Sequence, residues 1–368
     1  MKGTARLTRR QMLATSALGL AGTLIDRGHA KQGPRGWVRD PQRPVLSLGP
    51  AGAFDHWNIF APCVVKVKGR YYMFYSGGPQ GDPDLAPDTE GSGRQYVNYQ
   101  LGLALSDDGV HFHKTGGPIF PLTERANFHA APALLRKPNT ELHKENGLWH
   151  LVFNGNRRND VEHATSPDGL TWALDARNPI YRDAYAPCLL KVGGEYRMYH
   201  VDGSQRPWRI FLATGPDLYS LSPHPANPML ELDQHNWEAQ WEPGPDGVRS
   251  PAALVYPYVW KEDKTWIMYY AAYWKSGWGV LTTAMGMATS PDGIVWKKNP
   301  DNPVFTPVRD SSYDRAYVSS QTILRDRGGY VMYYAARIDT VHKYFCIARA
   351  TWQGKMLRTP SPSGRGLG

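Results

Sequence analysis

Residues 61–77 read APCVVKVKGRYYMFYSG, and residues 184–203 read AYAPCLLKVGGEYRMYHVDG. Both stretches consist of an apolar run, a turn and a second run that is rich in aromatic residues. Looser copies of this pattern occupy residues 130–155, 250–272 and 319–336. Two β-rich runs around a turn are typical of a β-hairpin. Five copies of one hairpin predict a repeat architecture.

Two further elements accompany the hairpins. A run with an Asp-Gly or Asp-Leu turn, which predicts another pair of strands, lies at 101–112, 163–172, 212–221 and 285–296. A proline followed by two apolar residues, which is expected to form the outer strand, lies at 118–120, 179–181, 228–230 and 303–305. A fifth copy of this last element, Pro44–Leu46, stands alone before the first hairpin.

These elements predict an all-β fold, a five-bladed β-propeller closed by an N-terminal strand. Each blade would have four strands, and the displaced copy at 44–46 would complete the last blade. Such closure removes an exposed sheet edge, which is an aggregation hazard. We expect the propeller over residues 31–358 and a short polar tail at 359–368. A β-sandwich whose hairpins are similar by coincidence is the competing interpretation.

Composition and charge limit the functions that the chain can have. The 368 residues are 41% hydrophobic and 12% aromatic, which excludes a disordered chain. Of the formal charge of +9, residues 1–30 carry +4, and the other +5 is spread without a dense basic run. A mildly basic, solvated surface is therefore expected, with no nucleic-acid partner.

The first thirty residues are expected to be a targeting segment. Thr8-Arg9-Arg10-Gln11-Met12-Leu13 precedes a short, mildly apolar stretch that ends at Gly28-His29-Ala30. This arrangement resembles a bacterial twin-arginine signal peptide, which implies a periplasmic or secreted protein. The apolar stretch is too short for a stable membrane anchor. A basic N-terminal helix that stays attached is the alternative.

No cofactor is expected. Cys63, Cys188 and Cys346 fit neither a disulfide framework nor a zinc motif, and buried free thiols are expected instead. The insert at 77–100 contains several acidic residues and offers oxygen atoms for calcium. Its spacing matches no EF-hand, so a wall of the pocket is the favoured interpretation.

The chemistry is expected where the first strand of each blade begins, because these ends open on one face around the channel. Acidic residues recur just before these strands, interleaved with aromatic residues, at Asp55, Asp183, Glu238, Glu242 and Asp314. Cleavage of a glycosidic bond needs two carboxyl groups in different environments. Flanking Trp and Tyr rings suit the faces of sugars.

In its blades and acidic residues the chain resembles the five-bladed glycosidases of glycoside hydrolase family 43 and their relatives, which act on arabinose, xylose and fructose units. The resemblance implies an exported glycoside hydrolase that cleaves poly- or oligosaccharides at pentose or furanose units. It assigns Asp55 as the base that polarises water, Asp183 as the residue that raises the pKa of the acid, and Glu242 as that acid. Inversion at the anomeric carbon is the implied outcome. Glu238 competes with Glu242 for the acid role.

Eight residues are expected to bind substrate: Trp57, Asn58, His129, Tyr185, His200, Trp241, Asp314 and Arg315. Two other functions stay open at this point. A carbohydrate-binding propeller without activity would use the same aromatic face but would not need paired carboxylates. A phosphorylase would replace water by phosphate and would depend on phosphate for turnover.

Overall fold

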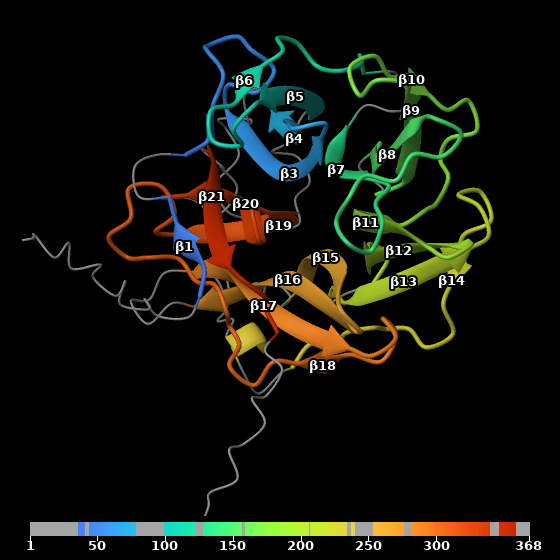
Figure 1. Cartoon of the computed structure of the whole chain (residues 1–368), viewed down its shortest axis with the longest axis vertical. Helices are drawn as coiled ribbons and strands as arrows, with labels where there is room; N and C mark the ends of the chain where they lie inside the picture. The colour runs from blue at the N-terminus through green and yellow to red at the C-terminus, as the bar shows by residue number, and fades with distance from the viewer. Residues whose placement is uncertain are drawn as a thin grey trace, which may run out of the picture. The chain divides into compact units, whose positions relative to one another are not determined.

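The computed structural model describes residues 36–40, 44–78, 99–122, 128–156, 159–205, 207–233, 237–239, 253–275, 281–338 and 346–357. They form five antiparallel sheets arranged as a five-bladed β-propeller, which confirms the predicted fold (Figure 1). The predicted signal peptide and tail lie outside the described residues. Within these ranges no helix has the length and apolar character needed to cross a membrane.

Each of the first four blades consists of four consecutive strands. Blade one contains β3 (Asn58–Val67), β4 (Arg70–Gly78), β5 (Gln100–Ser106) and β6 (His113–Lys114). Blade two contains β7 (Ala130–Leu134), β8 (Trp149–Asn154), β9 (Val161–Ser166) and β10 (Ala173–Leu174). Blade three contains β11 (Ala184–Val192), β12 (Glu195–Asp202), β13 (Ile210–Gly215) and β14 (Ser222–Pro223). Blade four contains β15 (Leu254–Glu262), β16 (Thr265–Lys275), β17 (Leu281–Ser290) and β18 (Lys297–Lys298).

Blade five joins the two ends of the propeller. It contains β19 (Tyr317–Asp326), β20 (Gly329–Arg337) and β21 (Cys346–Gln353). The N-terminal strands β1 (Val38–Arg39) and β2 (Leu46–Ser47) both pair with β21, as Figure 1 shows for β1. The expected closure by an N-terminal strand is therefore confirmed. The first strands β3, β7, β11, β15 and β19 contact one another in a ring and are the inner strands.

The expected position of the outer strand is wrong in the first four blades. That strand lies some residues before the proline element, as at His113–Lys114, which precedes Pro118. In blades two to four the proline element follows an Asn whose side-chain oxygen accepts a hydrogen bond from a third-strand N–H, at Asn178, Asn227 and Asn302. The amide oxygen takes an acceptor position at the sheet edge. The apolar residues after the proline also make backbone bridges to the third strand, at Tyr181, Leu230 and Phe305.

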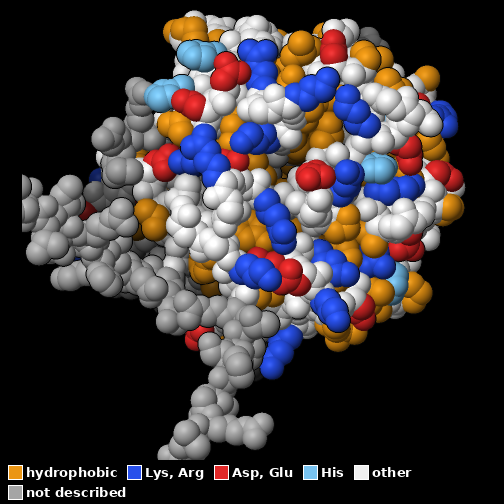
Figure 2. Space-filling view, viewed as in Figure 1, with side chains coloured by type: hydrophobic (Ala, Val, Ile, Leu, Met, Phe, Trp, Pro, Cys, Tyr) orange, Lys and Arg blue, Asp and Glu red, His pale blue; other side chains and the backbone are white. Residues whose placement is uncertain are grey.

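The apolar cores lie between neighbouring blades. One cluster joins Val64 and Tyr75 of blade one to Leu324 and Tyr333 of blade five. All three cysteines are free and buried, as expected. On the face drawn in Figure 2, Lys and Arg side chains alternate with Asp and Glu side chains and form no single basic field.

Two glycines make room for buried tyrosine rings. Gly102 lies opposite Tyr75 in the register of β4 and β5, and a Cβ atom there would overlap Cζ of the ring. Gly286 holds the same position against Tyr270 in blade four. Both rings are completely buried, so they cannot move aside without disturbing an inter-blade core.

Gly102→Ala is therefore expected to lower the free energy of unfolding by about 1–3 kcal/mol, because the added methyl overpacks the core. Gly117→Ala is the matched control, since an added Cβ there meets nothing within 4 Å. Its effect should stay within about 0.5 kcal/mol. Denaturant unfolding of the two variants measures both values, and equal stabilities would contradict the packing argument.

Candidate active site at the mouth of the propeller axis

Every inner strand is interrupted by a β-bulge at the same level. The bulged residue has a positive φ of 46–54° in all five blades, at Ala61, Ala131, Ala186, Tyr256 and Ser320. In four blades the next residue is proline, which has no N–H to donate to a neighbouring strand. A strand cannot continue its regular pairing through a proline, which favours the bulge in these four blades; in blade five the strand bulges with Gln321 at this position.

The bulges divide the axis into two parts. They surround an axial cavity of about 40 Å³. A cluster of buried residues that draws on the bulges and on aromatic rings from all five blades packs there. We call the end at which the inner strands begin the mouth. Its described residues include Asn58, Tyr99, Phe128, Asp183, Tyr185, Trp208 and Tyr256.

Aromatic rings of blades three and four meet at the mouth. The hydroxyl groups of Tyr185 and Tyr256 are 2.8 Å apart, and Trp208 stacks on Tyr185 with ring centroids 5.5 Å apart. All three side chains are half-buried, so part of each ring remains accessible. Burial raises the pKa of Tyr185 to about 12, which keeps its hydroxyl protonated at neutral pH.

A second aromatic group covers the blade-one side. Asn58 donates a hydrogen bond from Nδ2 to the hydroxyl of Tyr99 at 2.7 Å, and both side chains are buried. The rings of Phe128 and Tyr99 form a T-shaped pair with centroids 5.1 Å apart. Asn58, which was expected to bind substrate, thus orients Tyr99 at the start of the inner strand.

Asp183 is the exposed acidic residue of the mouth in blade three. Its backbone is held in a left-handed conformation, with a φ of 55°. The carbonyl of Asp183 accepts a hydrogen bond from the N–H of Gly203 at 2.7 Å, and the next N–H, of Ala184, donates to Asn159. Its carboxylate forms no hydrogen bond or ion pair with another residue of the described ranges. A fixed backbone thus presents an unengaged carboxylate to solvent.

The acidic residue expected as the base has different surroundings. Asp55 is 2% exposed. Its Oδ2 atom accepts a hydrogen bond from the hydroxyl of Tyr75 at 2.8 Å and lies 2.6 Å from Nζ of Lys114 on β6. Its assignment as the catalytic base stays a prediction, and what the structure describes is a buried ion pair.

The same acid–tyrosine–cation cluster recurs in two other blades. In blade four, Glu238 in the short 3-10 helix η1 (Trp237–Ala239) accepts a 2.6 Å hydrogen bond from Tyr270 and pairs with Lys298 on β18. In blade five, Asp314 accepts a 2.9 Å hydrogen bond from Tyr334 and lies 2.6 Å from Arg39 on β1. Glu238 and Asp314 are completely buried.

Register shows that the three clusters are equivalent. Lys114, Lys298 and Arg39 face Ala104, Ala288 and Ala350 of their third strands. In blades two and three the corresponding outer-strand residues are Leu174 and Pro223, and no cation is present there. Phe153 and His200 replace the tyrosine in these two blades. Among the described residues the complete cluster of acid, tyrosine and cation therefore occurs in blades one, four and five, where it joins the parts of the blade.

The other predicted site residues differ in their burial and contacts. His129 is buried between Phe120 and Phe153. His200 is buried against Tyr181, and burial lowers its pKa to about 4, so it is neutral at neutral pH. Trp57 is half-buried, whereas Arg315 is exposed and donates from Nε to the carbonyl of Ile338. Trp241, Glu242 and most of the acidic insert lie outside the described residues.

Sequence reasoning missed three residues of the mouth: Tyr99, Trp208 and Tyr256. Tyr99 and Trp208 precede third strands. The insert at 77–100 was expected to form a wall of the pocket, but no residue between a second and a third strand was assigned to substrate. Tyr256 follows from a better alignment of the repeats, because Tyr256-Pro257 matches Ala61-Pro62 in the bulge register. The proline of blade four that corresponds to Pro62 is therefore Pro257 and not Pro251.

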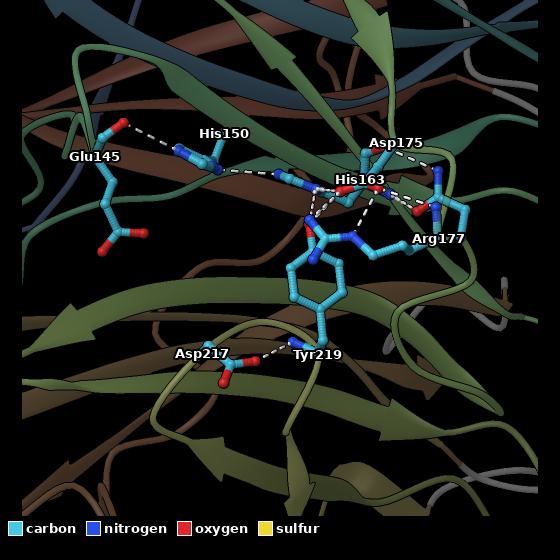
Figure 3. A network of polar contacts seen from close by, with 8 residues as sticks. Glu145, His150, His163, Asp175, Arg177, Asp217 and Tyr219 are labelled. Atoms are coloured by element: carbon cyan, nitrogen blue, oxygen red, sulfur yellow. Dashed lines mark hydrogen bonds and ion pairs between the residues drawn. The ribbon is translucent and has the colours of Figure 1, made fainter.

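A separate polar network joins blades two and three away from the mouth (Figure 3). His150 and His163 are in contact at 3.0 Å with stacked rings, and Nδ1 of His163 lies 3.0 Å from Asp175. Burial raises the pKa of Asp175, but hydrogen bonds from Tyr219, Arg177 and His163 outweigh it and leave the pKa below its ordinary value. Tyr219 comes from blade three, so the network connects neighbouring blades.

Comparison with known proteins identifies relatives in structure but not in sequence. No protein-family model and no curated protein matches this sequence. A glycoside hydrolase of known structure has a TM-score of 0.64 and 14% identity over 88% of this chain and 96% of its own. β-1,2-Mannobiose phosphorylase from Listeria innocua has a TM-score of 0.62 and 14% identity over 86% and 96%. The catalytic domain of GH62 α-L-arabinofuranosidase from Coprinopsis cinerea has a TM-score of 0.56 and 12% identity over 86% and 97%. The shared property is the fold.

Proposed function

We propose that the protein is a carbohydrate-active enzyme that cleaves glycosidic bonds at the mouth of the propeller. The observation that carries this proposal is the grouping of half-buried rings, Tyr185, Trp208 and Tyr256, beside the exposed carboxylate of Asp183. Such rings bind the apolar faces of sugars, and their hydroxyl groups bind sugar oxygens. Glycosidases and a phosphorylase of β-1,2-mannobiose among the structural neighbours support the substrate class.

Hydrolysis needs an acid and a base. We assign the base to Asp183, because its carboxylate is exposed at the mouth, whereas Asp55 is buried against Lys114. The acid remains Glu242, on the resemblance to family 43, since Glu238 is buried against Lys298. In this scheme Asp183 removes a proton from water as it attacks the anomeric carbon, and Glu242 gives its proton to the leaving oxygen.

Inversion is the proposed stereochemical outcome, and pentose or furanose units are the proposed substrates. Inverting enzymes hold the two carboxyl groups roughly 6.5–9.5 Å apart so that a water fits between them. Proton NMR of the first product anomer tests this directly. A product that retains the anomeric configuration would exclude the scheme.

Phosphorolysis is the second candidate. Arg182, which precedes Asp183, is exposed and lies 3.3 Å from Asp160 at the same end of the propeller. A guanidinium at this place could bind a phosphate that attacks in place of water. A panel of chromogenic glycosides and polysaccharides, assayed with and without phosphate, separates the candidates. No turnover of any substrate but measurable sugar binding would indicate a carbohydrate-binding protein instead.

Replacing either stacked ring is expected to weaken substrate binding. Tyr185→Ala and Trp208→Ala should each raise KM about 3- to 10-fold, because an aromatic stacking contact contributes about 0.5–1.5 kcal/mol, and should change kcat less. Steady-state kinetics on the best substrate of the panel measures both constants. Tyr219→Ala is the control, since Tyr219 is partly exposed but lies in the network of Figure 3. An equal rise of KM in the control would argue against a subsite at these rings.

Export through the N-terminal twin-arginine segment is part of the proposal, with the periplasm or the medium as destination. The mature chain would begin close to residue 31. Mass spectrometry of protein recovered from the periplasmic fraction locates the cleavage. Protein that stays in the cytoplasm with an intact N-terminus would contradict the proposed export.

A further inference from the structure

The axial cavity contains one charged side chain, that of Arg136. The cavity is lined by the five bulges and their neighbours, and no acidic residue is among the described residues that line it. Arg136 follows β7 and is 2% exposed. Its backbone bridges to Leu190 of the neighbouring inner strand, with its carbonyl accepting from Lys191 at 2.9 Å. The guanidinium lies over the ring of Tyr258, from blade four, at 4.0 Å.

Arg136 departs from the pattern of the other blades. The residue five positions after the bulged residue is cationic in every blade: Lys66, Arg136, Lys191, Lys261 and Arg325. Four of these cations lie over an aromatic ring that begins the second strand of their own blade, at Tyr71, Tyr196, Trp266 and Tyr330. In blade two the corresponding ring is Trp149, and Lys144 from the longer hairpin lies over it at 5.5 Å. Arg136 is therefore free of this contact and lines the axis.

The charge of Arg136 has no counter-charge in the described part of the chain. Nη2 donates to Sγ of Cys188 at 3.2 Å and to the carbonyl of Val259 at 3.4 Å, while Nη1 has no hydrogen-bond partner among the described residues. Burial raises the pKa of Cys63 to about 11 and also raises those of Cys188 and Tyr258. These groups are therefore neutral at neutral pH. A buried charge without compensation is strongly unfavourable.

We propose that the axial cavity binds one small monovalent anion, of the size of chloride, on the guanidinium of Arg136. A cavity of about 40 Å³ has room for a monatomic ion and a water, since a single water centre needs about 10–15 Å³. The hydroxyl groups of Ser320 and Thr322 line the same cavity and can donate to the anion. The unpartnered Oε1 of Gln321 accepts hydrogen bonds only, so it would bind the accompanying water.

Bromide tests the site in the full chain, because it has the charge of chloride and scatters anomalously. Crystals soaked in sodium bromide should show one anomalous peak in hydrogen-bond range of Nη1 of Arg136. In solution, raising bromide from 1 to 200 mM at constant ionic strength, with methanesulfonate as the balancing anion, should raise Tm by about 3 °C. Arg136→Met should lose this rise, and Arg325→Met, the same position in blade five but exposed, should keep it.

Two results would overturn the proposal. One is a bromide map with no peak on the axis, or with a water alone beside Arg136. The other is the same bromide response in the wild type and both variants, which would indicate a general salt effect. If Arg136→Met does not fold, the bromide map of the wild-type crystal decides alone. Neither measurement uses a sugar substrate, so the outcome is independent of the proposed hydrolysis.

Discussion

Asp183→Asn is expected to lower kcat by about 10²–10⁴-fold, the range by which a positioned general base accelerates a reaction. An amide at this position cannot take a proton from the attacking water. Asparagine tolerates the left-handed backbone of Asp183 as well as aspartate does, so the loop should keep its shape. The carboxylate is exposed and makes no ion pair within the described ranges, so the free energy of unfolding should change by less than about 0.5 kcal/mol.

Asp202→Asn is the matched control for this variant. Asp202 ends β12 opposite Ala184, and its carboxylate accepts hydrogen bonds from Ser204 and Gln205 in a local turn. Asp202 lies beside Asp183 in the fold and has no assigned role in the reaction. The kcat of Asp202→Asn should therefore fall less than threefold. Steady-state kinetics and denaturant unfolding of both variants make the comparison. Full activity in Asp183→Asn would show that Asp183 is not the catalytic base.

Asp55→Asn is expected to lower the free energy of unfolding by about 2–4 kcal/mol, because Lys114 would lose its buried counter-charge. The hydrogen bond from Tyr75 would also lose its charged acceptor. Adding Lys114→Met should restore part of the stability, since the remaining cluster is then neutral. Asp107→Asn is the control, because Asp107 forms an exposed ion pair with Arg70 that contributes little.

This experiment also decides between the two roles considered for Asp55. If Asp55 only joins the blade, Asp55→Asn should retain most of its kcat at a temperature where it is folded. If Asp55 is the base, kcat should fall by orders of magnitude at that temperature, and Lys114→Met should restore stability without restoring kcat. Denaturant unfolding and kinetics on the same preparations distinguish the outcomes.

Much of the fold could be predicted from local patterns. The hairpin at 61–77 appears as β3 and β4, and the isolated Pro44–Leu46 leads into β2, which pairs with β21. Such patterns succeed because strand and turn preferences act within a few residues of the backbone. The outer strands were misplaced for the same reason. They are only two residues long, and the proline elements beside them join the same third strands through isolated backbone bridges and asparagine side chains rather than through a regular ladder.

The candidate site could be predicted only in part. Acidic residues do recur before the inner strands, as at Asp55 and Asp314, but recurrence alone does not distinguish a catalytic carboxylate from a buried one. The partner of Asp314 is Arg39, 275 residues away in the chain. No local pattern indicates that such residues meet, because their pairing depends on how the ring closes.

The sequence by itself determined the number of blades and the hairpins, since both follow from short-range preferences repeated five times, and the displaced copy at 44–46 indicated how the ring closes. Only the tertiary structure decided which carboxylates are buried beside a cation and which, like Asp183, face solvent. It also decided that Arg136 lines the axis, whereas its four counterparts lie over rings of their own blades. Solvent exposure and counter-charge depend on residues distant in the chain, and these quantities determine what an ionisable group can do.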